Sequence, residues 1–155
     1  MRGFIALVAV SLLIVAPAEA GPPEDATATV TTMLDKFNGG DIDAFFAAHQ
    51  DDAVIIDEFA PYFWSGSRSA QRWAEDYAKD SAAKGITGGR VDYGKPIRAT
   101  SDGGRAYIVL PTTYRFVENG TKKAGTGSMT FVMTRVGNDW KIASWTYSGA
   151  APTAE

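Results

Sequence analysis

The sequence lacks cysteine altogether and contains a single histidine, His49. The absence of cysteine excludes disulfide bonds, thiolate metal ligands and a lipid anchor attached to a cysteine. One imidazole without a second imidazole or a thiolate is a poor basis for a metal site. We therefore predict neither a metal nor a cofactor, and a domain that its hydrophobic core alone must stabilise.

Clusters of basic residues are also missing. The formal net charge is -3, and the lysines and arginines are scattered, with Lys122-Lys123 as the densest pair. Nucleic-acid binding requires a concentrated basic face, so we predict no nucleic-acid partner. The glycine-rich stretch Gly125-Thr126-Gly127 is too short for a phosphate loop and leads into a predicted strand instead of a helix.

One apolar stretch, Phe4–Ala16, stands near the start of the chain, after Arg2 and before Ala18-Glu19-Ala20. A positive charge, a short apolar run and a small-x-small site are typical of a secretory signal, whereas a membrane span needs about 20 apolar residues. We predict that residues 1–20 are a signal peptide cleaved after Ala20. The mature chain is then secreted or periplasmic and contains no integral membrane segment.

The remaining sequence predicts one domain over residues 21–148 and a disordered tail, rich in alanine and proline, over residues 149–155. Apolar residues at helical spacing predict a helix from about Asp25 to Gly39, a short one after Asp41, and a third over Ser69–Lys84. The run Ala53–Ile56, between the second and third predicted helices, predicts a buried strand.

The second half of the chain predicts a meander of antiparallel strands near 87–100, 105–118, 123–136 and 140–148. The turn Asn119-Gly120 supplies the positive φ that a tight hairpin demands. Pro111 cannot donate a ladder hydrogen bond, so it predicts a bulge or an edge. Helices followed by strands indicate an α+β fold. We expect three N-terminal helices packed on a curved antiparallel sheet that forms a cone with one small pocket.

Several short motifs, taken in order, resemble the SnoaL-like, nuclear transport factor 2-like superfamily over Asp25–Ser148. They are Gly40-Asp41-Ile42-Asp43-Ala44, Asp51–Asp57, Gly66 before the third helix, and Trp140–Trp145 with Ser148. The resemblance implies the ketosteroid isomerase-like cone fold, an α+β barrel, and a homodimer formed through the outer face of the sheet. The superfamily includes ketosteroid isomerases, polyketide cyclases, scytalone dehydratases and non-catalytic dimerisation and ligand-binding domains, so the fold does not decide the function.

Asp57 is the catalytic candidate. The resemblance implies that it is the general base, because the isomerase and cyclase branches carry their base at the end of this strand. Glu58 should point the opposite way along an extended backbone, and both could equally be ordinary exposed carboxylates. The isomerases' tyrosine and sheet-borne acid align with Met33 and Phe131, which cannot donate a hydrogen bond, so the resemblance does not extend to steroid isomerisation.

Aromatic residues supply the ligand-binding candidates. We select Tyr62, Trp64, Tyr114 and Tyr147, because a buried phenol or indole needs a polar partner and such walls suit a flat apolar ligand. The resemblance places Tyr147 at a pocket tryptophan of the isomerases. His49 is a further ligand-binding candidate by resemblance to the cyclases and dehydratases. Its position near the end of the second helix also fits a structural role.

Three functions therefore remain open. The first is an exported SnoaL-like domain that binds a small apolar or aromatic molecule in its cone. The second is an isomerase, cyclase or dehydratase that uses Asp57 as the base and Tyr62 or Tyr114 as the donor. The third is a non-catalytic dimerisation or protein-interaction module.

Overall fold

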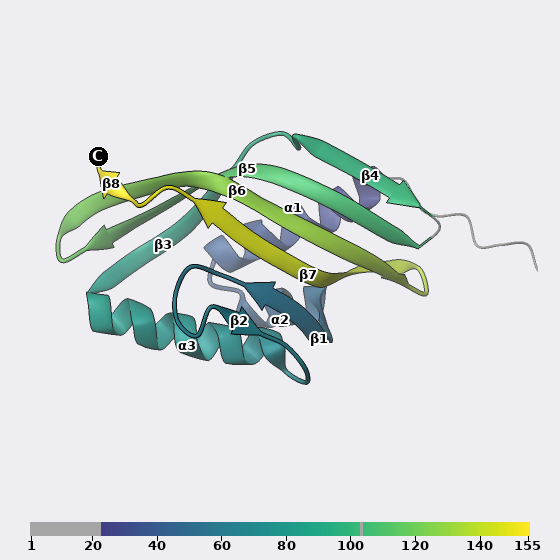
Figure 1. The fold of residues 1–155 in the computed structure, drawn as a ribbon, viewed down its shortest axis with the longest axis horizontal. Helices are drawn as coiled ribbons and strands as arrows, with labels where there is room; N and C mark the ends of the chain where they lie inside the picture. The colour runs from purple at the N-terminus through teal and green to yellow at the C-terminus, as the bar shows by residue number, and fades with distance from the viewer. Residues whose placement is uncertain (1–22, 103) are drawn as a thin grey trace, which may run out of the picture.

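A computed structural model describes residues 23–102 and 104–155, so the predicted signal peptide lies outside the described residues. Helices α1 (Pro23–Asn38), α2 (Ile42–Ala48) and α3 (Ser69–Lys84) lie on one side of a curved sheet (Figure 1). The sheet contains β1 (His49–Ile56), β2 (Phe63–Trp64), β3 (Ile86–Tyr93), β4 (Arg98–Asp102), β5 (Arg105–Glu118), β6 (Thr121–Val136), β7 (Asp139–Gly149) and β8 (Thr153–Ala154). The predicted α+β class is confirmed. None of the described helices is both long and apolar enough to cross a membrane.

The strand order is β2-β1-β7-β6-β5-β3, with β4 beside β5 and β8 beside β6. The long hairpins β5–β6 and β6–β7 follow the predicted meander, and Asn119 and Gly120 both take positive φ in the first of the two turns. The sheet is mixed in one place, because β1 runs parallel to β7. Strand β1 follows α2 and pairs with the last long strand of the chain, a partner that its local sequence cannot specify.

The predicted strand over residues 87–100 is two strands, β3 and β4, which pair with different halves of β5. Pro111 of β5 lies opposite the break between them, where the N–H of Gly94 donates to its carbonyl over 3.0 Å. The N and O of a strand residue face the same neighbour, so the missing N–H of Pro111 also faces the break. Pairing of β5 with β6 continues through Pro111 without a register shift, so there is no bulge at this residue. Pro111 instead lies at a local edge, because neither β3 nor β4 pairs with β5 there.

Register shifts elsewhere bend the sheet. One lies between β6 and β7, where Val132 pairs with Ser144 and Met133 pairs with Ile142, which leaves Ala143 as an extra residue. Another lies in β3 between Thr87 and Arg90. Because an extra residue on one strand increases local twist and bending, these irregularities help curve the sheet into a cone.

Local hydrogen bonds position the helices against this cone. Asp41 caps α2 as its side chain accepts from the backbone N–H of Ala44, and Gly85 ends α3 in the left-handed conformation. The Asn38 side chain donates to the carbonyl of Val91 and accepts from its N–H, over 2.8 and 2.9 Å. These two bonds tie the end of α1 to β3.

Residues 149–155, which the sequence predicts to be a disordered tail, instead lie along β6. Strand β8 pairs with Lys123 and Ala124, and Glu155 forms an ion pair with Arg115. Strand β6 extends beyond its partner β7 and leaves unpaired backbone groups there. An open edge of this kind accepts an added strand, so the tail has a partner that its own composition does not reveal.

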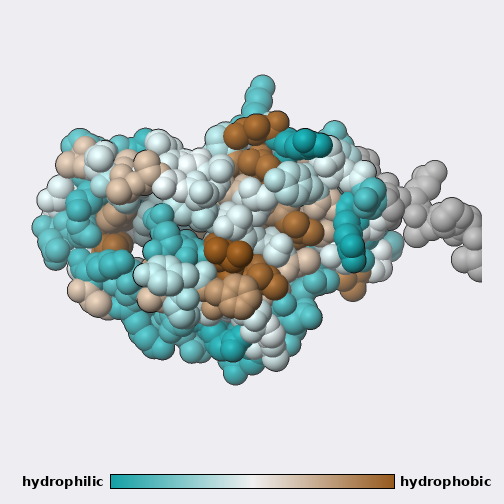
Figure 2. Space-filling view, viewed as in Figure 1, coloured by the Kyte–Doolittle hydropathy of each residue, from teal (hydrophilic) through white to brown (hydrophobic). Residues whose placement is uncertain are grey.

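Exposed apolar side chains on the described chain are few. Figure 2 shows the hydrophobic residues of one face in several separate patches, one of them near its middle, with hydrophilic residues between and around them. Ile56 and Phe63, of the paired strands β1 and β2, are 47% and 54% exposed.

His49 is buried at the junction of α2, β1 and β7. Its Nδ1 lies 2.7 Å from the carbonyl oxygen of Phe45, and its Nε2 accepts from the indole Nε1 of Trp145 over 3.0 Å. Indole is a donor only, so Nε2 carries no proton and Nδ1–H donates to the Phe45 carbonyl. Burial lowers the pKa of His49 from 6.5 to about 4, which keeps the ring neutral.

Stability should therefore depend on pH through His49. Between pH 6.5 and about 4 the unfolded chain binds a proton that the folded chain excludes, so the free energy of unfolding decreases as the pH falls. At about 1.4 kcal/mol per pH unit, this contribution is at most about 3.5 kcal/mol. We expect His49→Gln to be less stable at pH 7 but to lose less stability on acidification, as measured by urea unfolding at several pH values. Equal losses in the two proteins would contradict the assignment.

Candidate functional site

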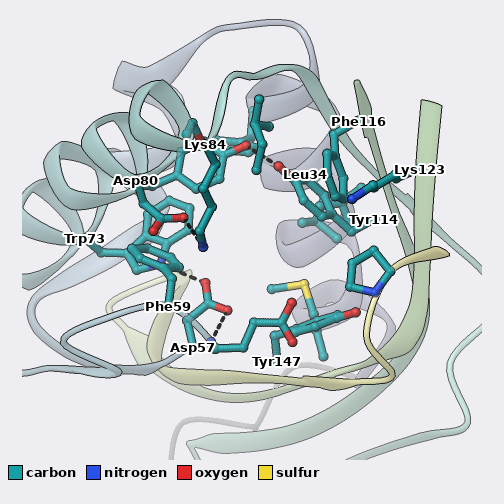
Figure 3. A pocket seen from close by; sticks show the side chains of 18 of the residues that line it. Leu34, Asp57, Phe59, Trp73, Asp80, Lys84, Tyr114, Phe116, Lys123 and Tyr147 are labelled. Carbon is teal, nitrogen blue, oxygen red and sulfur yellow. Dashed lines mark hydrogen bonds and ion pairs between the residues drawn. The ribbon is translucent and has the colours of Figure 1, made fainter. Parts of the chain in front are cut away.

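A pocket of about 410 Å³ opens between the helices and the concave side of the sheet (Figure 3). Its volume lies within the range of small-molecule sites. The apolar and aromatic lining residues are Met33, Leu34, Phe37, Phe45, Phe59, Trp73, Tyr77, Ile86, Val91, Tyr114, Phe116, Met129, Trp145, Tyr147, Ala151 and Pro152. The polar lining residues are Asp57, Glu58, Asp80, Ser81, Lys84, Glu118 and Lys123.

Asp57 lines this pocket directly after β1. The indole Nε1 of Trp73 donates to its Oδ2 over 2.9 Å, and the backbone N–H of Glu58 donates to its Oδ1 over 2.8 Å (Figure 3). Burial raises the pKa of the Asp57 carboxyl, and the two hydrogen bonds offset part of that effect. The chain thus holds a carboxylate of increased basicity in a fixed orientation against an apolar cavity.

Glu58 lines the same pocket, and the expectation that it points away from Asp57 is wrong. Strand β1 ends at Ile56, and the chain then turns, with the Asp57 N–H donating to the Tyr62 carbonyl and the Tyr62 N–H to that of Phe59. Side chains alternate only along an extended strand, so the alternation does not reach Glu58. Partial burial and the neighbouring Asp57 raise the pKa of the Glu58 carboxyl.

Two tyrosine hydroxyls meet where α3 approaches β5 along the pocket. Tyr77 of α3 and Tyr114 of β5 are hydrogen bonded over 2.8 Å, and Gly89 of β3 lies directly behind them. A Cβ at Gly89 would lie 2.4 and 2.7 Å from the two oxygens, so this position has no space for a side chain. Burial raises the pKa of Tyr114, and the proximity of Tyr77 raises it further. One hydroxyl donates to the other, so the pair retains one O–H that it can donate to a ligand.

Tyr147 contributes a third hydroxyl, which is buried and has no hydrogen-bond partner within the described structure. Its oxygen lies over Gly149, where a Cβ would come within 2.2 Å. Burial raises the pKa of Tyr147, as do the nearby Glu58 and Asp57. This oxygen packs against Gly149 and Gly127 and is closed to solvent, so Tyr147 contributes its ring to the pocket wall while its hydroxyl stays unpaired within the described structure.

The two lysines of the pocket are already paired. Lys84 lies 2.8 Å from Asp80, four residues earlier on α3, and Lys123 pairs with Glu118 across the β5–β6 hairpin. Asp57 and Glu58 have no ion-pair partner within the described structure. The charge of the site is therefore negative when both carboxyl groups are ionised.

The structure brings Asp57, Tyr114 and Tyr147 together and places the other three candidates elsewhere. Tyr62 is 59% exposed, at positive φ in the loop after β1. Trp64 is buried against Phe59, and its Nε1 donates to Asp76 over 3.0 Å, away from the pocket. His49 lies in the interior junction described above.

Tyr77 was not among the pocket candidates selected from the sequence, although it lines the pocket. The glycine pair Gly88-Gly89 inside a strand was the available signal, because glycine in a strand often marks the close approach of another group. Among residues 23–102 and 104–155, no group of three or more His, Cys, Asp or Glu side chains could hold a metal ion.

Comparison with known proteins identifies the family. The model of the SnoaL-like domain matches residues 26–152. No curated protein sequence matches the chain.

Solved structures share the fold at low sequence identity. A ketosteroid isomerase-like protein from Erwinia carotovora atroseptica SCRI1043 matches with a TM-score of 0.65 and 18% identity, over 83% of this chain and 96% of that one. Hexachlorocyclohexane dehydrochlorinase LinA-type3 from Novosphingobium barchaimii LL02 matches with a TM-score of 0.67 and 12% identity, over 85% of this chain and 86% of that one. The CaMKII hub of S. rosetta matches with a TM-score of 0.66 and 17% identity, over 86% and 100%.

These similar structures include an enzyme and a hub domain, so they establish the architecture and not the activity. The family model, in contrast, covers nearly all of the described residues. The chain therefore belongs to the SnoaL-like domain family.

Proposed function

We propose that the protein binds a small aromatic or apolar molecule in the cone and that Asp57 removes a proton from it. The observation that carries this proposal is the Asp57 carboxylate, whose pKa is raised by burial and whose two oxygens are held by Trp73 and the Glu58 backbone. A general base works best when its pKa approaches the operating pH, and it must be fixed within reach of the proton that it takes.

The opposite wall supplies proton donors. Asp57 and Trp73 lie on one side of the cavity and Tyr114 on the other (Figure 3). A ligand between them can present a C–H group to Asp57 while the oxygen of its adjacent carbonyl accepts a hydrogen bond from the Tyr77–Tyr114 pair. Removal of the proton builds negative charge on that oxygen, and the phenol stabilises it. This division of roles suits an isomerase, a cyclase or a dehydratase.

Steroid isomerisation by the isomerase mechanism is not part of the proposal. Met33 lines the pocket and Phe131 is fully buried in the core, and neither side chain has an O–H or N–H group. The donor of this protein must come from another position, for which Tyr114 is the best-placed candidate.

Replacing Asp57 by Asn tests catalysis separately from binding. A thermal-shift screen against small ketones, lactones, aromatic acids and sterols supplies the ligand, since saturation at 100 times its dissociation constant adds about 2.7 kcal/mol of stability. We expect Asp57→Asn to slow solvent deuterium exchange at the acidic C–H of that ligand by about 100-fold or more. Its affinity for the ligand should change only slightly.

Asp76→Asn is the matched control, because Asp76 also accepts from an indole, that of Trp64, but lies outside the pocket. It should leave both affinity and exchange unchanged. Exchange at the wild-type rate in Asp57→Asn would contradict the role of Asp57 as a base. The protein would then be a ligand-binding domain without catalysis, which the apolar cavity alone also supports.

The pH profile provides an independent test of the base. Only ionised Asp57 accepts a proton, so the exchange rate should fall as the pH falls through its raised pKa. The Trp73 hydrogen bond favours the ionised form, so Trp73→Phe should move this acidic limb to higher pH. An unmoved limb in the variant would assign it to another group, of which Glu58 is the nearest.

We also propose that the protein is exported and forms a homodimer. The charge and apolar pattern of residues 1–20 supports export. Tyr107 and Val132 support pairing, because they are cross-strand neighbours on the outer face of β5 and β6, opposite the buried side chains of Ile108 and Phe131. Light scattering at micromolar concentration should give twice the mass of one chain, and Tyr107→Glu should reduce it. A single-chain mass for the wild type would contradict the dimer.

A further inference from the structure

The pocket contains more negative charge than its lysines neutralise. Lys84 and Lys123 are held by Asp80 and Glu118, as described above. Asp57 accepts two hydrogen bonds, but the donors are a neutral indole and a neutral amide. Asp57 and Glu58 thus form no ion pair in the described chain, although the nearby charge of Lys84 offsets part of the increase in the pKa of Glu58.

Glu58 is the less constrained of the two carboxylates. It lines the pocket yet is exposed to solvent, so it stands at the opening, and within the described structure its carboxylate forms no hydrogen bond and no ion pair. Trp73 fixes Asp57 deeper in the cavity, whereas the Glu58 side chain is available to a group that enters from outside.

Aromatic rings surround this negative end. Trp73 and Tyr77 are stacked with centroids 5.2 Å apart and planes 13° from parallel, and Phe59 packs 6.2 Å from Trp73. Tyr147 lies close enough to Glu58 for that carboxylate to raise its pKa. Tyr77 and Phe45 are both stacked on Trp73, so this ring contributes an apolar wall and not a free aromatic face. Carboxylates without an ion-pair partner beside an aromatic wall form a surface that favours a positively charged nitrogen with an apolar skeleton.

We propose that the ligands of this pocket are aromatic or apolar amines. The protonated nitrogen lies at the opening, against Glu58 and the neighbouring rings, and the carbon skeleton fills the cavity next to Asp57. This inference rests on the proposed function and specifies its substrate class. The same arrangement disfavours ligands that carry a carboxylate, because Asp57 and Glu58 repel them and both lysines would first have to leave their acidic partners.

Three probes of similar shape and different charge test the proposal. Naphthylmethylamine is a cation at neutral pH, naphthylmethanol is neutral and naphthoate is an anion. Isothermal titration calorimetry on the purified protein should give the amine a dissociation constant about tenfold lower than that of the alcohol. Naphthoate should bind more weakly than either. An alcohol or an anion that binds as tightly as the amine would overturn the inference while leaving the binding function in place. Failure of all three probes to bind would overturn both.

Glu58→Gln locates the effect. This substitution keeps the shape of the side chain and removes its charge, so the amine should lose most of its advantage while the affinity for naphthylmethanol stays the same. Glu75→Gln is the matched control, because it makes the same change of charge on α3 outside this pocket. It should leave all three affinities unchanged. An equal loss of amine affinity in both variants would assign the preference to overall charge and overturn the role of Glu58.

Discussion

The parallel pairing of β1 with β7 is the constraint on which the site depends. Ile55 lies opposite Trp145 and Ile56 opposite Thr146, so the residues that follow, Asp57 and Tyr147, lie beside each other where β1 ends. Parallel strands advance in the same direction, whereas in an antiparallel partner the chain would run from Thr146 to Tyr147 in the direction opposite to that from Ile56 to Asp57. The hydrogen bond between His49 and Trp145 holds the same two strands together within the core.

The site also illustrates how a small domain accommodates polar groups in an apolar cavity. Desolvation disfavours the Asp57 carboxylate, and two neutral donors return only part of the lost hydration. The tyrosine hydroxyls need space against the sheet, which glycine supplies behind Tyr77 and Tyr114 at Gly89 and behind Tyr147 at Gly149. The pocket thus depends on the glycines of the strands, which leave space for the tyrosine hydroxyls, as well as on the side chains that line it.

Local patterns made the frame of this fold predictable. Asn119-Gly120 specifies its hairpin through backbone conformation alone, and the capping role of Asp41 needs only the next few residues. Asp57 follows a buried apolar run, and the family resemblance assigned it the role of the base. Each of these signals is contained within a few residues of sequence.

Features that depend on distant contacts were not predictable in the same way. The orientation of Glu58 depends on where β1 ends, and the role of Tyr77 depends on Tyr114 and Gly89, which belong to other elements. Aromatic composition selected Tyr62 and Trp64 as readily as Tyr114, since it cannot distinguish an exposed loop or a packed core from a cavity wall. His49 shows the same limit, because its partner Trp145 lies on the last long strand.

The segment after β7 forms one wall of the cavity and is held by fewer hydrogen bonds than the strands beside it. Ala151 and Pro152 line the pocket, and the segment that carries them is held by the two-residue strand β8 and by the ion pair of Glu155 with Arg115. Strand β8 pairs with only Lys123 and Ala124, whereas β5, β6 and β7 pair along most of their length. Release of this segment would therefore open the wall at Ala151 and Pro152 while the β5–β6–β7 core stayed paired, so the cavity can change its shape without unfolding of the domain.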